Sequence, residues 1–306
     1  MRVRVLGSAA GGGFPQWNCG CPNCRGVRAG AIPAAPRTQE SVAVSADGKA
    51  WFLLNASPEI RAQIESFPAL HPRGPRDSPV AGILLTNGDL DHCLGLLSLR
   101  ESYPVTVYAT DRVRRGFTDE NVLYRTLERF EGQVTWRSLK PGREEELAGP
   151  GGNASGLTVE AVAVPGKPPV HLMGRFPPDR EDNVGFRIRE RSMGRVLAYL
   201  SGVAAVTPAV FHALEGAACV FFDGTFWSND ELIALGLGRQ RAEDMAHLPV
   251  GGPGGSLAAL ADHRSGRRVY IHINNTNPIL REDSPERAAV EAGGWTVAHD
   301  GLEIEL

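Results

Sequence analysis

The chain lacks the features that would insert it into a membrane or direct it out of the cell. No apolar run among its 306 residues approaches the roughly 18–20 residues that span a bilayer. The opening MRVRVLGSAAGGGF is a short alternating strand followed by a glycine turn, without the apolar stretch or cleavage context of a secretory signal. These absences predict a cytoplasmic protein with no membrane partner.

An excess of positive charge is missing as well. The chain carries 32 Lys and Arg against 35 Asp and Glu, a net charge of −3, with a pI near 6.3. This balance offers no electrostatic basis for binding nucleic acid. Repeats and low-complexity linkers are also absent, and the 42% apolar content is enough for a substantial core. We therefore expect one domain over residues 1–306, with a boundary at the loop Pro141–Gly156 as the alternative.

Short Val-, Ile-, Leu- and Phe-rich stretches alternate with helical ones, which predicts an α/β fold. The Asp47-Gly48 turn predicts an antiparallel hairpin, so the sheets should be mixed. The expected strands are Arg2–Leu6, Ser41–Ser45, Trp51–Asn55, Val80–Thr86, Val105–Ala109, Val196–Ser201, Cys219–Asp223, Val269–Ile273 and Leu302–Leu306. The expected helices are Ser57–Ser66, Asp119–Arg129, Thr207–Leu214, Ser256–Asp262 and Ser284–Gly293.

The five cysteines require an explanation other than cross-linking, because structural disulfides are rare in the cytosol. Cys19, Cys21 and Cys24 form C-x-C-x-x-C in a loop at about residues 17–26. This spacing lets one loop supply three corners of a tetrahedral zinc site, which we favour over a redox group or chance. Cys93 and Cys219 have the surroundings of buried core thiols.

A polar turn follows the strand that ends at Thr86. It contains Asn87, Asp89, Asp91 and His92, in the sequence LTNGDLDH. Polar groups at the carboxyl end of a strand are typical of sites in open α/β sheets. Two carboxylates and an imidazole within four positions predict a divalent metal site. The alternative is an acidic helix N-terminus with His92 packed in the first turn.

A second strand end, in VYIHINNTNP, contains His272 followed by three asparagines and a threonine. A lone histidine there is often only hydrogen-bonded, but the polar run makes His272 a candidate ligand.

Together these segments resemble the metallo-β-lactamase superfamily, which carries H-x-H-x-D-H after a buried strand and a late histidine after its last core strand. Asn87 and Asp89 stand where the family has its first two histidines, whereas Asp91, His92 and His272 match. The resemblance implies an αββα sandwich with mixed sheets.

The sequence departs from that family at two further ligands. The middle histidine should lie near Ala163–Pro168, which holds none, and Gly202 replaces the bridging aspartate. A two-zinc hydrolase needs more ligands than remain. The surviving Asp91, His92 and His272, with Asp89 as a fourth candidate, suit a non-haem Fe(II) oxygenase, although zinc binds the same ligand types.

The whole chain resembles the pyrroloquinoline quinone (PQQ) biosynthesis protein B family, PqqB. The resemblance rests on LGSAAGGGFPQWNCGCPNC, TNGDLDHCLGLLSLRE, VPGKPP, LAYLSGVAAV, FFDGTFWSNDEL, MAHLPVGGPGGSLAAL and IHINNTNPIL. It implies an iron- and dioxygen-dependent hydroxylase that oxygenates the tyrosine-derived ring of a cross-linked Glu-Tyr precursor. A zinc hydrolase and a non-catalytic carrier of PQQ or its precursor remain alternatives. A homodimer and docking of other pathway enzymes also stay open.

Relatives in the superfamily complete the cysteine cluster with a histidine three residues beyond the late one. Asn275 stands there, a weak zinc ligand, so the fourth corner is unassigned; His247 and a water are remote candidates.

The implied substrate is small and rich in carboxylates. His247 is a candidate proton donor or a surface histidine, and Lys167 a substitute cation near the vacated histidine or a solvated lysine. The amides of Gly254, Gly255 and Ser256 at a helix start are candidate carboxylate donors. Further candidate substrate contacts are Arg37, Gln39 and Thr225.

Overall fold

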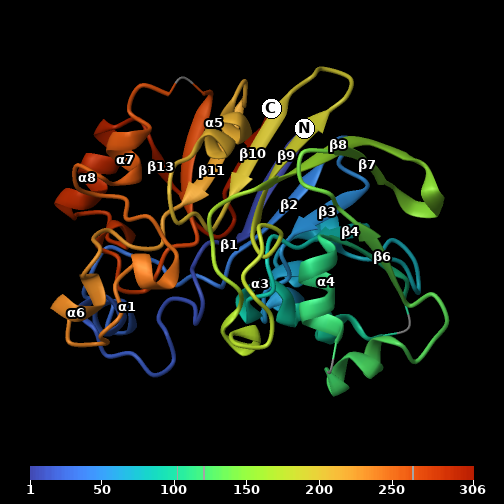
Figure 1. Cartoon of the computed structure of the whole chain (residues 1–306), viewed down its shortest axis with the longest axis horizontal. Helices are drawn as coiled ribbons and strands as arrows, with labels where there is room; N and C mark the ends of the chain where they lie inside the picture. Colours follow the sequence, from blue (N-terminus) through green and yellow to red (C-terminus); the bar gives the residue numbers. More distant parts are fainter. Residues whose placement is uncertain (102, 120, 264) are drawn as a thin grey trace.

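The structure is a computed structural model that describes residues 1–101, 103–119, 121–263 and 265–306. Two seven-stranded mixed sheets lie face to face with helices on both outer sides, so the predicted αββα sandwich is confirmed (Figure 1). None of the helices in the described ranges combines the length and apolarity that crossing a bilayer requires.

The first sheet has the order β14-β1-β2-β3-β4-β5-β6. Its strands are β1 (Arg2–Gly7), β2 (Ser41–Ser45), β3 (Trp51–Leu54), β4 (Val80–Leu84), β5 (Val105–Ala109), β6 (Val134–Ser138) and β14 (Glu303–Glu305). The second sheet has the order β13-β12-β11-β10-β9-β8-β7. Its strands are β7 (Glu144–Ala148), β8 (Ala154–Ala163), β9 (Val184–Glu190), β10 (Val196–Leu200), β11 (Cys219–Asp223), β12 (Arg267–Ile271) and β13 (Thr296–Val297).

The helices are short and lie mostly between strands. The α-helices are α1 (Pro22–Arg28), α2 (Ile60–Glu65), α3 (Leu90–Cys93), α4 (Asp111–Thr118), α5 (Pro208–Leu214), α6 (Glu231–Ala234), α7 (Ser256–Ala259) and α8 (Pro285–Ala292). The 3-10 turns are η1 (Pro68–Leu70), η2 (Leu94–Leu99), η3 (Val122–Leu127), η4 (Pro150–Gly152), η5 (Val170–Leu172), η6 (Glu243–Met245) and η7 (Pro278–Leu280).

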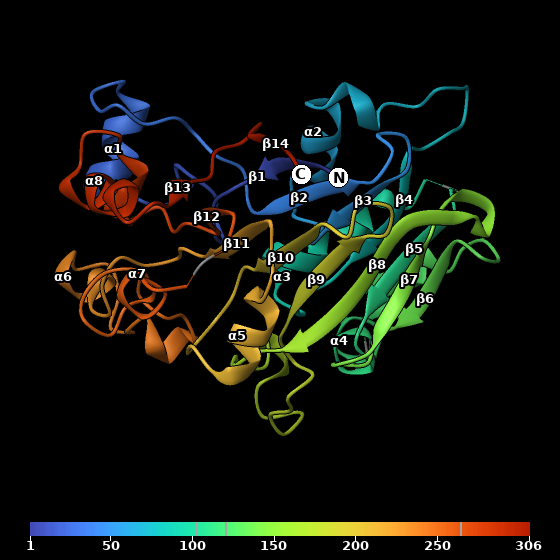
Figure 2. The ribbon, with the colours of Figure 1, turned by 90° about the horizontal axis from the view of Figure 1, so that it is seen from above.

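Alternation along the strands divides the core into three layers. In β3, Phe52 and Leu54 face the second sheet and join a cluster that includes Phe186 and Phe221. Leu53 faces the opposite way, toward α2 and α4. Since both faces of each sheet are covered, the strands β3, β10 and β11 are buried along their whole length and almost entirely apolar. Figure 2 shows the two sheets from above, with the N- and C-termini side by side. There β1 pairs with β14.

The nine predicted strands are all present, within one to two residues at most ends. The predicted loop Pro141–Gly156 was wrong, because it contains β7 and the start of β8. β7 reads EEELA, and a charged, partly exposed edge strand carries little apolar signal. β6, β8, β9 and β13 were also missed.

Three helix predictions were inaccurate. The predicted helix Ser57–Ser66 begins only at Ile60, and Ser57 does not cap it. The predicted helix Asp119–Arg129 is a 3-10 turn, η3, which follows the unpredicted helix α4; Glu120 lies outside the described residues. The predicted helix Ser256–Asp262 ends at Ala259. Thr207 and Ser284, each followed by a proline, cap α5 and α8 through their hydroxyls, whereas the same pattern at Ser57 does not form a cap.

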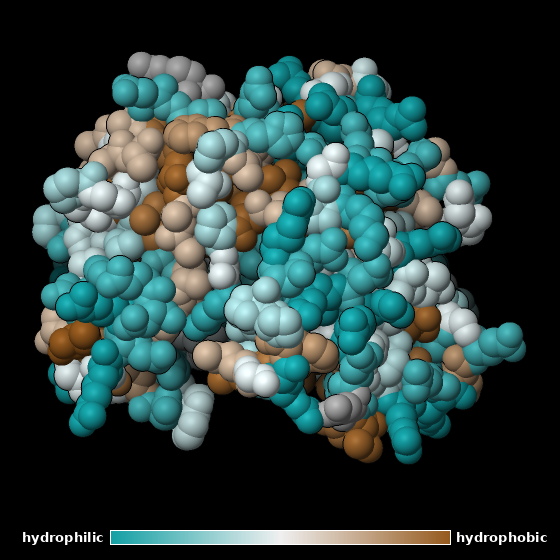
Figure 3. Space-filling model, in the orientation of Figure 1, coloured by the Kyte–Doolittle hydropathy of each residue, from teal (hydrophilic) through white to brown (hydrophobic). Residues whose placement is uncertain are grey.

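The face seen in Figure 3 is mostly hydrophilic, with apolar atoms gathered near α5. Phe211 of α5 is 45% exposed.

Candidate metal centre and active site

The site lies where strand ends from both sheets meet. β4 and β12 run parallel to their neighbours, so the polar residues that follow them, Thr86 and His272, come to one edge. β2 is antiparallel to β3, so the residue before β2, Glu40, reaches the same edge as Asn55, which follows β3. This edge explains why side chains far apart in sequence meet.

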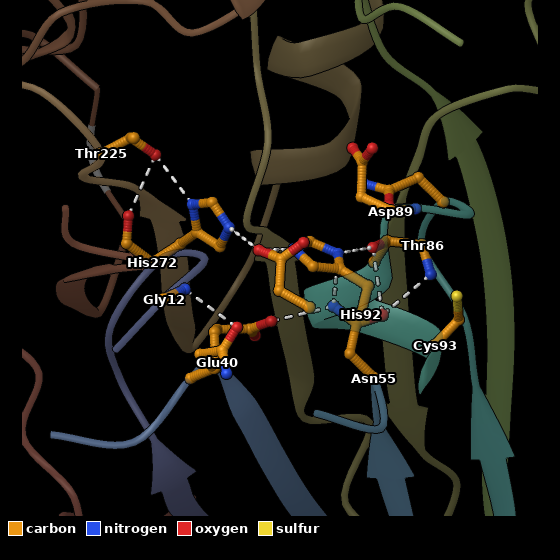
Figure 4. A network of polar contacts seen from close by, with 12 residues as sticks. Gly12, Glu40, Asn55, Thr86, Asp89, His92, Cys93, Thr225 and His272 are labelled. Atoms are coloured by element: carbon orange, nitrogen blue, oxygen red, sulfur yellow. Dashed lines mark hydrogen bonds and ion pairs between the residues drawn. The ribbon is translucent and has the colours of Figure 1, made fainter. Parts of the chain in front are cut away.

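Asp91, His92 and His272 converge as one cluster. The two histidines are labelled in Figure 4. Their donor atoms lie within 4.8 Å of one another. Asp91 Oδ2 is 3.2 Å from His272 Nε2 and 3.5 Å from His92 Nε2. Asp91 and His92 come from α3, and His272 comes from the loop after β12. Two imidazoles and one carboxylate at this spacing can bind a single divalent cation, with other positions open.

Two threonines hold the two imidazoles in matching ways. Thr86 Oγ1 lies 2.9 Å from His92 Nδ1, and Thr225 Oγ1 lies 2.8 Å from His272 Nδ1. Each hydroxyl in turn donates to another acceptor, Asn55 Oδ1 and Asp223 Oδ1 respectively. The hydrogen-bond network therefore places a proton on Nδ1 of both rings, which leaves both Nε2 atoms facing Asp91.

The protonation of the three groups is coupled. Burial alone would raise the pKa of Asp91, but the charge of His92 and the hydrogen bond to His272 hold that pKa well below its usual range. Burial opposes the charge of His272 too, but Asp91 raises its pKa to about 9. Burial lowers the pKa of His92 to about 4. Without a metal, a proton between Asp91 and His272 therefore occupies the place that a cation would take.

Backbone strain concentrates at this site. Within the described residues, Asn55, Ala246 and His272 are the non-glycine residues with positive φ, at 63°, 63° and 57°. Such conformations persist where surrounding contacts over-determine them, and they are common at functional sites. Gly11 shows close approach instead, since a Cβ there would lie 3.3 Å from Asp91 Oδ2.

His247 lies beside the triad and is paired with Asp223. His247 Nδ1 is 2.7 Å from Asp223 Oδ2, and the His247 ring stacks on His272 at 5.4 Å between centroids. Asp223 is fully buried and accepts from Val203 N and Thr225 N as well. Asp223, His247 and His272 also have donor atoms within 4.8 Å. Thr225 Oγ1 contacts all three residues, so we interpret this group as a hydrogen-bond network that orients His247.

Side-chain amides line the part of the site where metallo-β-lactamases bind their other metal ion. Asn87 Nδ2 donates to Asn183 Oδ1, and Asn183 Nδ2 donates to the Gly202 carbonyl. A side chain at Gly202 would point toward His247 and Asn183, so the glycine leaves open space there. Burial and the charge of Asp91 raise the pKa of Asp89 to about 6, while the nearby charge of Lys167 opposes the shift. Asp89 is not among the groups that converge with the triad.

The residues predicted to contact substrate are placed differently from one another. Thr225 is buried between His272 and Asp223, as described above. Gln39 contacts the glycine turn, accepting from Gly12 N and donating to Glu59. Arg37 is buried and donates to the Ala298 carbonyl, and burial lowers its pKa to about 10.

The glycine-rich turn before α7 uses some of its own amides. Gly255 N donates to Gly252 O and Ser256 N to Pro249 O, so these two amides are occupied. The Ser256 hydroxyl lies 3.0 Å from Tyr270 OH. Since α7 is only four residues long, this turn offers fewer free amide donors for an anion than the sequence predicted.

Cys19, Cys21 and Cys24 form the second convergent cluster, with Sγ atoms within 4.8 Å of one another. Asn275 lies at the vacant corner, where its Nδ2 is 3.1 Å from Cys19 Sγ and 3.3 Å from Cys24 Sγ. His247, the remote candidate for that corner, lies against Asp223 and His272 instead. The predicted core thiols Cys93 and Cys219 are buried.

Four site residues were missed from the sequence. Asp223 ends the apolar strand CVFFD, the same signal that drew attention to Asp91, so it could have been found. Asn55 and Thr86 also follow strands, but single polar residues at strand ends are common. Glu40 precedes an antiparallel strand, and only the sheet topology reveals that it reaches this edge.

Comparisons with known proteins agree with this architecture. The family model described as Beta-lactamase superfamily domain matches residues 50–273. A diphosphatase of the PhnP family shares the fold at a TM-score of 0.66 and 21% identity, covering all of this chain and 97% of that one.

More similar relatives align with this chain over the full length of both proteins. Coenzyme PQQ synthesis protein B of Stutzerimonas stutzeri is 45% identical over 307 residues, and that of Methylobacterium sp. (strain 4-46) is 47% identical over 310. The crystal structure of zinc-bound PqqB from Methylobacterium extorquens matches at a TM-score of 0.92 with 45% identity. The chain therefore belongs to the coenzyme PQQ synthesis protein B family, within the metallo-β-lactamase superfamily.

Proposed function

We propose that this protein is an Fe(II)- and dioxygen-dependent hydroxylase of PQQ biosynthesis, acting on the tyrosine-derived ring of a cross-linked Glu-Tyr precursor. The observation that carries the proposal is the convergence of Asp91, His92 and His272 around one position. Two histidines and one carboxylate with open positions are the ligand set of non-haem iron oxygenases. The metal, when bound, supplies the activation of dioxygen.

The ligand set also argues against two-metal hydrolysis. Two amides and a glycine line the second-metal side next to Asp89 and Lys167, where a dinuclear centre needs more carboxylates and imidazoles. The charge of Lys167 acts on Asp89 and would attract the carboxylates of the proposed substrate.

The protein side chains have distinct roles in this proposal. Thr86 and Thr225 orient the two imidazoles, so that Nε2 of each would be free to bind the cation. His247, held by Asp223, presents its second nitrogen for proton transfer at the substrate. One oxygen atom enters the ring and the other leaves as water. Each insertion therefore consumes two electrons from an external reductant and two protons.

A zinc hydrolase is the second candidate. The Asp223–His247 pair is suited to donate a proton to a leaving group, and the crystallised relative from Methylobacterium extorquens is described as zinc-bound. Such an enzyme would turn over without dioxygen or reductant.

We also propose that the cluster of Cys19, Cys21 and Cys24 holds a structural zinc.

The test is anaerobic loading with Fe(II), followed by dioxygen uptake and product mass with the cross-linked precursor and a reductant. We expect uptake matched to oxygen insertion, lost in Asp91→Asn. Asp283→Asn, on an exposed loop paired with Arg281, is the matched control and should behave as wild type. Turnover that persists under nitrogen would favour the hydrolase, and binding without turnover would favour a carrier.

A further inference from the structure

Beneath the triad lies a buried polar network whose central residue is Asn55. Its Nδ2 lies 2.9 Å from Glu40 Oε2, 3.1 Å from His92 Nδ1 and 3.3 Å from Tyr199 OH. Its Oδ1 accepts from Thr86 N and Thr86 Oγ1. All five residues are buried. Figure 4 shows the Glu40–Asn55–His92 connection.

Asn55 is over-determined by these contacts. Its φ of 63° is unusual for a residue with a side chain, and its carboxamide orientation is set by two donors on Thr86. Because Thr86 accepts from His92 Nδ1–H, the two hydrogens of Asn55 Nδ2 are left for Glu40 and Tyr199. The network is therefore directional, running from Glu40 through Asn55 and Thr86 to His92.

Glu40 is the anomalous member of the network. It is 0% exposed, and within the described residues its Oε1 has no hydrogen-bond partner and no Lys or Arg forms an ion pair with it. A buried carboxyl oxygen without a partner is rare and requires an explanation. Burial raises the pKa of Glu40 to about 8, while the charge of His272 and the Asn55 hydrogen bond oppose the shift and Asp91 adds to it.

We propose that Glu40 is an outer-sphere positioning residue of the metal centre, which orients His92 through Asn55 and Thr86 and supplies a second buried negative charge. The inference rests on the proposed metal site. A divalent cation bound by Asp91 and two neutral imidazoles leaves one uncompensated positive charge in a buried place, which is costly. The ionised form of Glu40 removes that excess charge.

In this arrangement, the carboxyl of Glu40 loses its proton when the cation binds. The titratable groups that face it are Asp91 and His272, with His92 beyond Asn55 and the Tyr199 hydroxyl on the second sheet. The cation replaces the proton held by Asp91 and His272, so both changes release protons and steepen the pH dependence of metal affinity.

The experiment measures Co(II) binding to metal-free protein by its visible spectrum at several pH values between about 6 and 9. Co(II) at the cysteine cluster gives separate thiolate charge-transfer bands, which report folding and the integrity of that site. In Glu40→Gln, which keeps an oxygen for Asn55 but loses the charge, we expect about 10–100-fold weaker binding at the triad. The dependence on pH should also be shallower by about one proton per ion.

Glu231→Gln is the matched control. Glu231 is also a buried carboxylate, with its pKa raised by burial to about 7, but it contacts Thr276 and Trp227 N instead of the triad network. We expect its affinity and pH slope at the triad to stay at the wild-type values. If Glu40→Gln retains wild-type affinity and slope, or Glu231→Gln loses as much, the role of Glu40 is overturned.

Glu40→Asp covers the case in which the glutamine variant does not fold. It keeps the charge but shortens the reach to Asn55, so we expect weakened affinity with the wild-type pH slope; wild-type affinity would overturn the positioning role. Asp91→Asn distinguishes the two proposals. If it still binds Co(II) normally at the nitrogen- and oxygen-ligated site, the metal site itself is misassigned, whatever Glu40 does.

Discussion

The protein contains two three-ligand clusters that are built in opposite ways. Cys19, Cys21 and Cys24 come from one loop, so their convergence is decided within six residues. Asp91 and His92 need His272, which lies 181 residues after Asp91, so their convergence depends on both sheets and on the polar contacts between them. The first cluster can form from one loop alone, whereas the second can form only when both sheets are correctly folded.

One short segment joins the two clusters. The side chain of His272 belongs to the triad, and the side chain of Asn275, three residues later, lies against the three thiols. Asn23 of α1 donates to the carbonyls of Asn275 and Asn277, which fixes the cysteine loop to this segment. Order in the cysteine cluster therefore helps to position a ligand of the other cluster.

Removing His272 should have the largest effect. In His272→Ala the triad loses a direct ligand, so the loss of activity should exceed the roughly 10–100-fold that outer-shell changes produce. Metal analysis should show the triad ion gone and the cysteine-bound ion retained. Normal hydroxylation by this variant would contradict the assigned site.

Cys24→Ala should act on stability instead. Loss of a structural metal belongs to the few mechanisms that cost about 3 kcal/mol or more in the free energy of unfolding. We expect a lower midpoint in urea and loss of the cysteine-bound metal. Cys219→Ala is the control, because that buried thiol lies in β11 outside the cluster. An equal loss of stability without a change in metal content would mean that Cys24 acts only by packing.

The difference between the clusters also explains what could be read from the sequence. The C-x-C-x-x-C spacing and the polar turn around Asp91 are local, and both were predicted to be metal sites before the fold was described. The strands that were found are mostly apolar. The missed ones include the charged edge strand β7 and the buried strand β9, whose sequence VGFRIRE mixes charged residues with apolar ones. Glu40 precedes β2 and Asn183 precedes β9. Each of these strands runs antiparallel to its neighbour, β3 or β10, and only this topology shows that its N-terminal end lies at the site.

The two threonines test whether the imidazoles depend on positioning from both sheets. Thr86→Val and Thr225→Val keep the shape but remove the acceptor for Nδ1–H. We expect each to weaken metal binding at the triad by about 10–100-fold, with little change at the cysteine cluster. Thr106→Val in β5 is the control. Effects confined to protein stability, with unchanged affinity in folded protein, would contradict the role in orientation.

The pH dependence of the metal-free protein should show the smallest effect. The folded pKa of His272 is raised to about 9, mainly by Asp91 against the opposing effect of burial, whereas an unfolded histidine titrates near 6.5. The Asp91–His272 interaction therefore contributes fully below about pH 6.5 and is lost as the pH rises through about 9. We expect the free energy of unfolding to fall by at most about 1.4 kcal/mol per pH unit within this range, because one proton is released. His92, with its pKa lowered by burial to about 4, stays neutral throughout.

Urea unfolding at several pH values measures this loss, and His272→Gln isolates it from other groups such as Glu40. The glutamine variant should lose the part of the slope that belongs to His272, whereas the remainder persists. Metal reverses the sign, because the cation binds neutral His272 and its affinity rises with pH. The stability of the loaded protein should therefore hold or increase from about pH 6.5 to 9 while that of the metal-free protein falls. Parallel curves with and without metal would show that His272 does not exchange its proton for the cation.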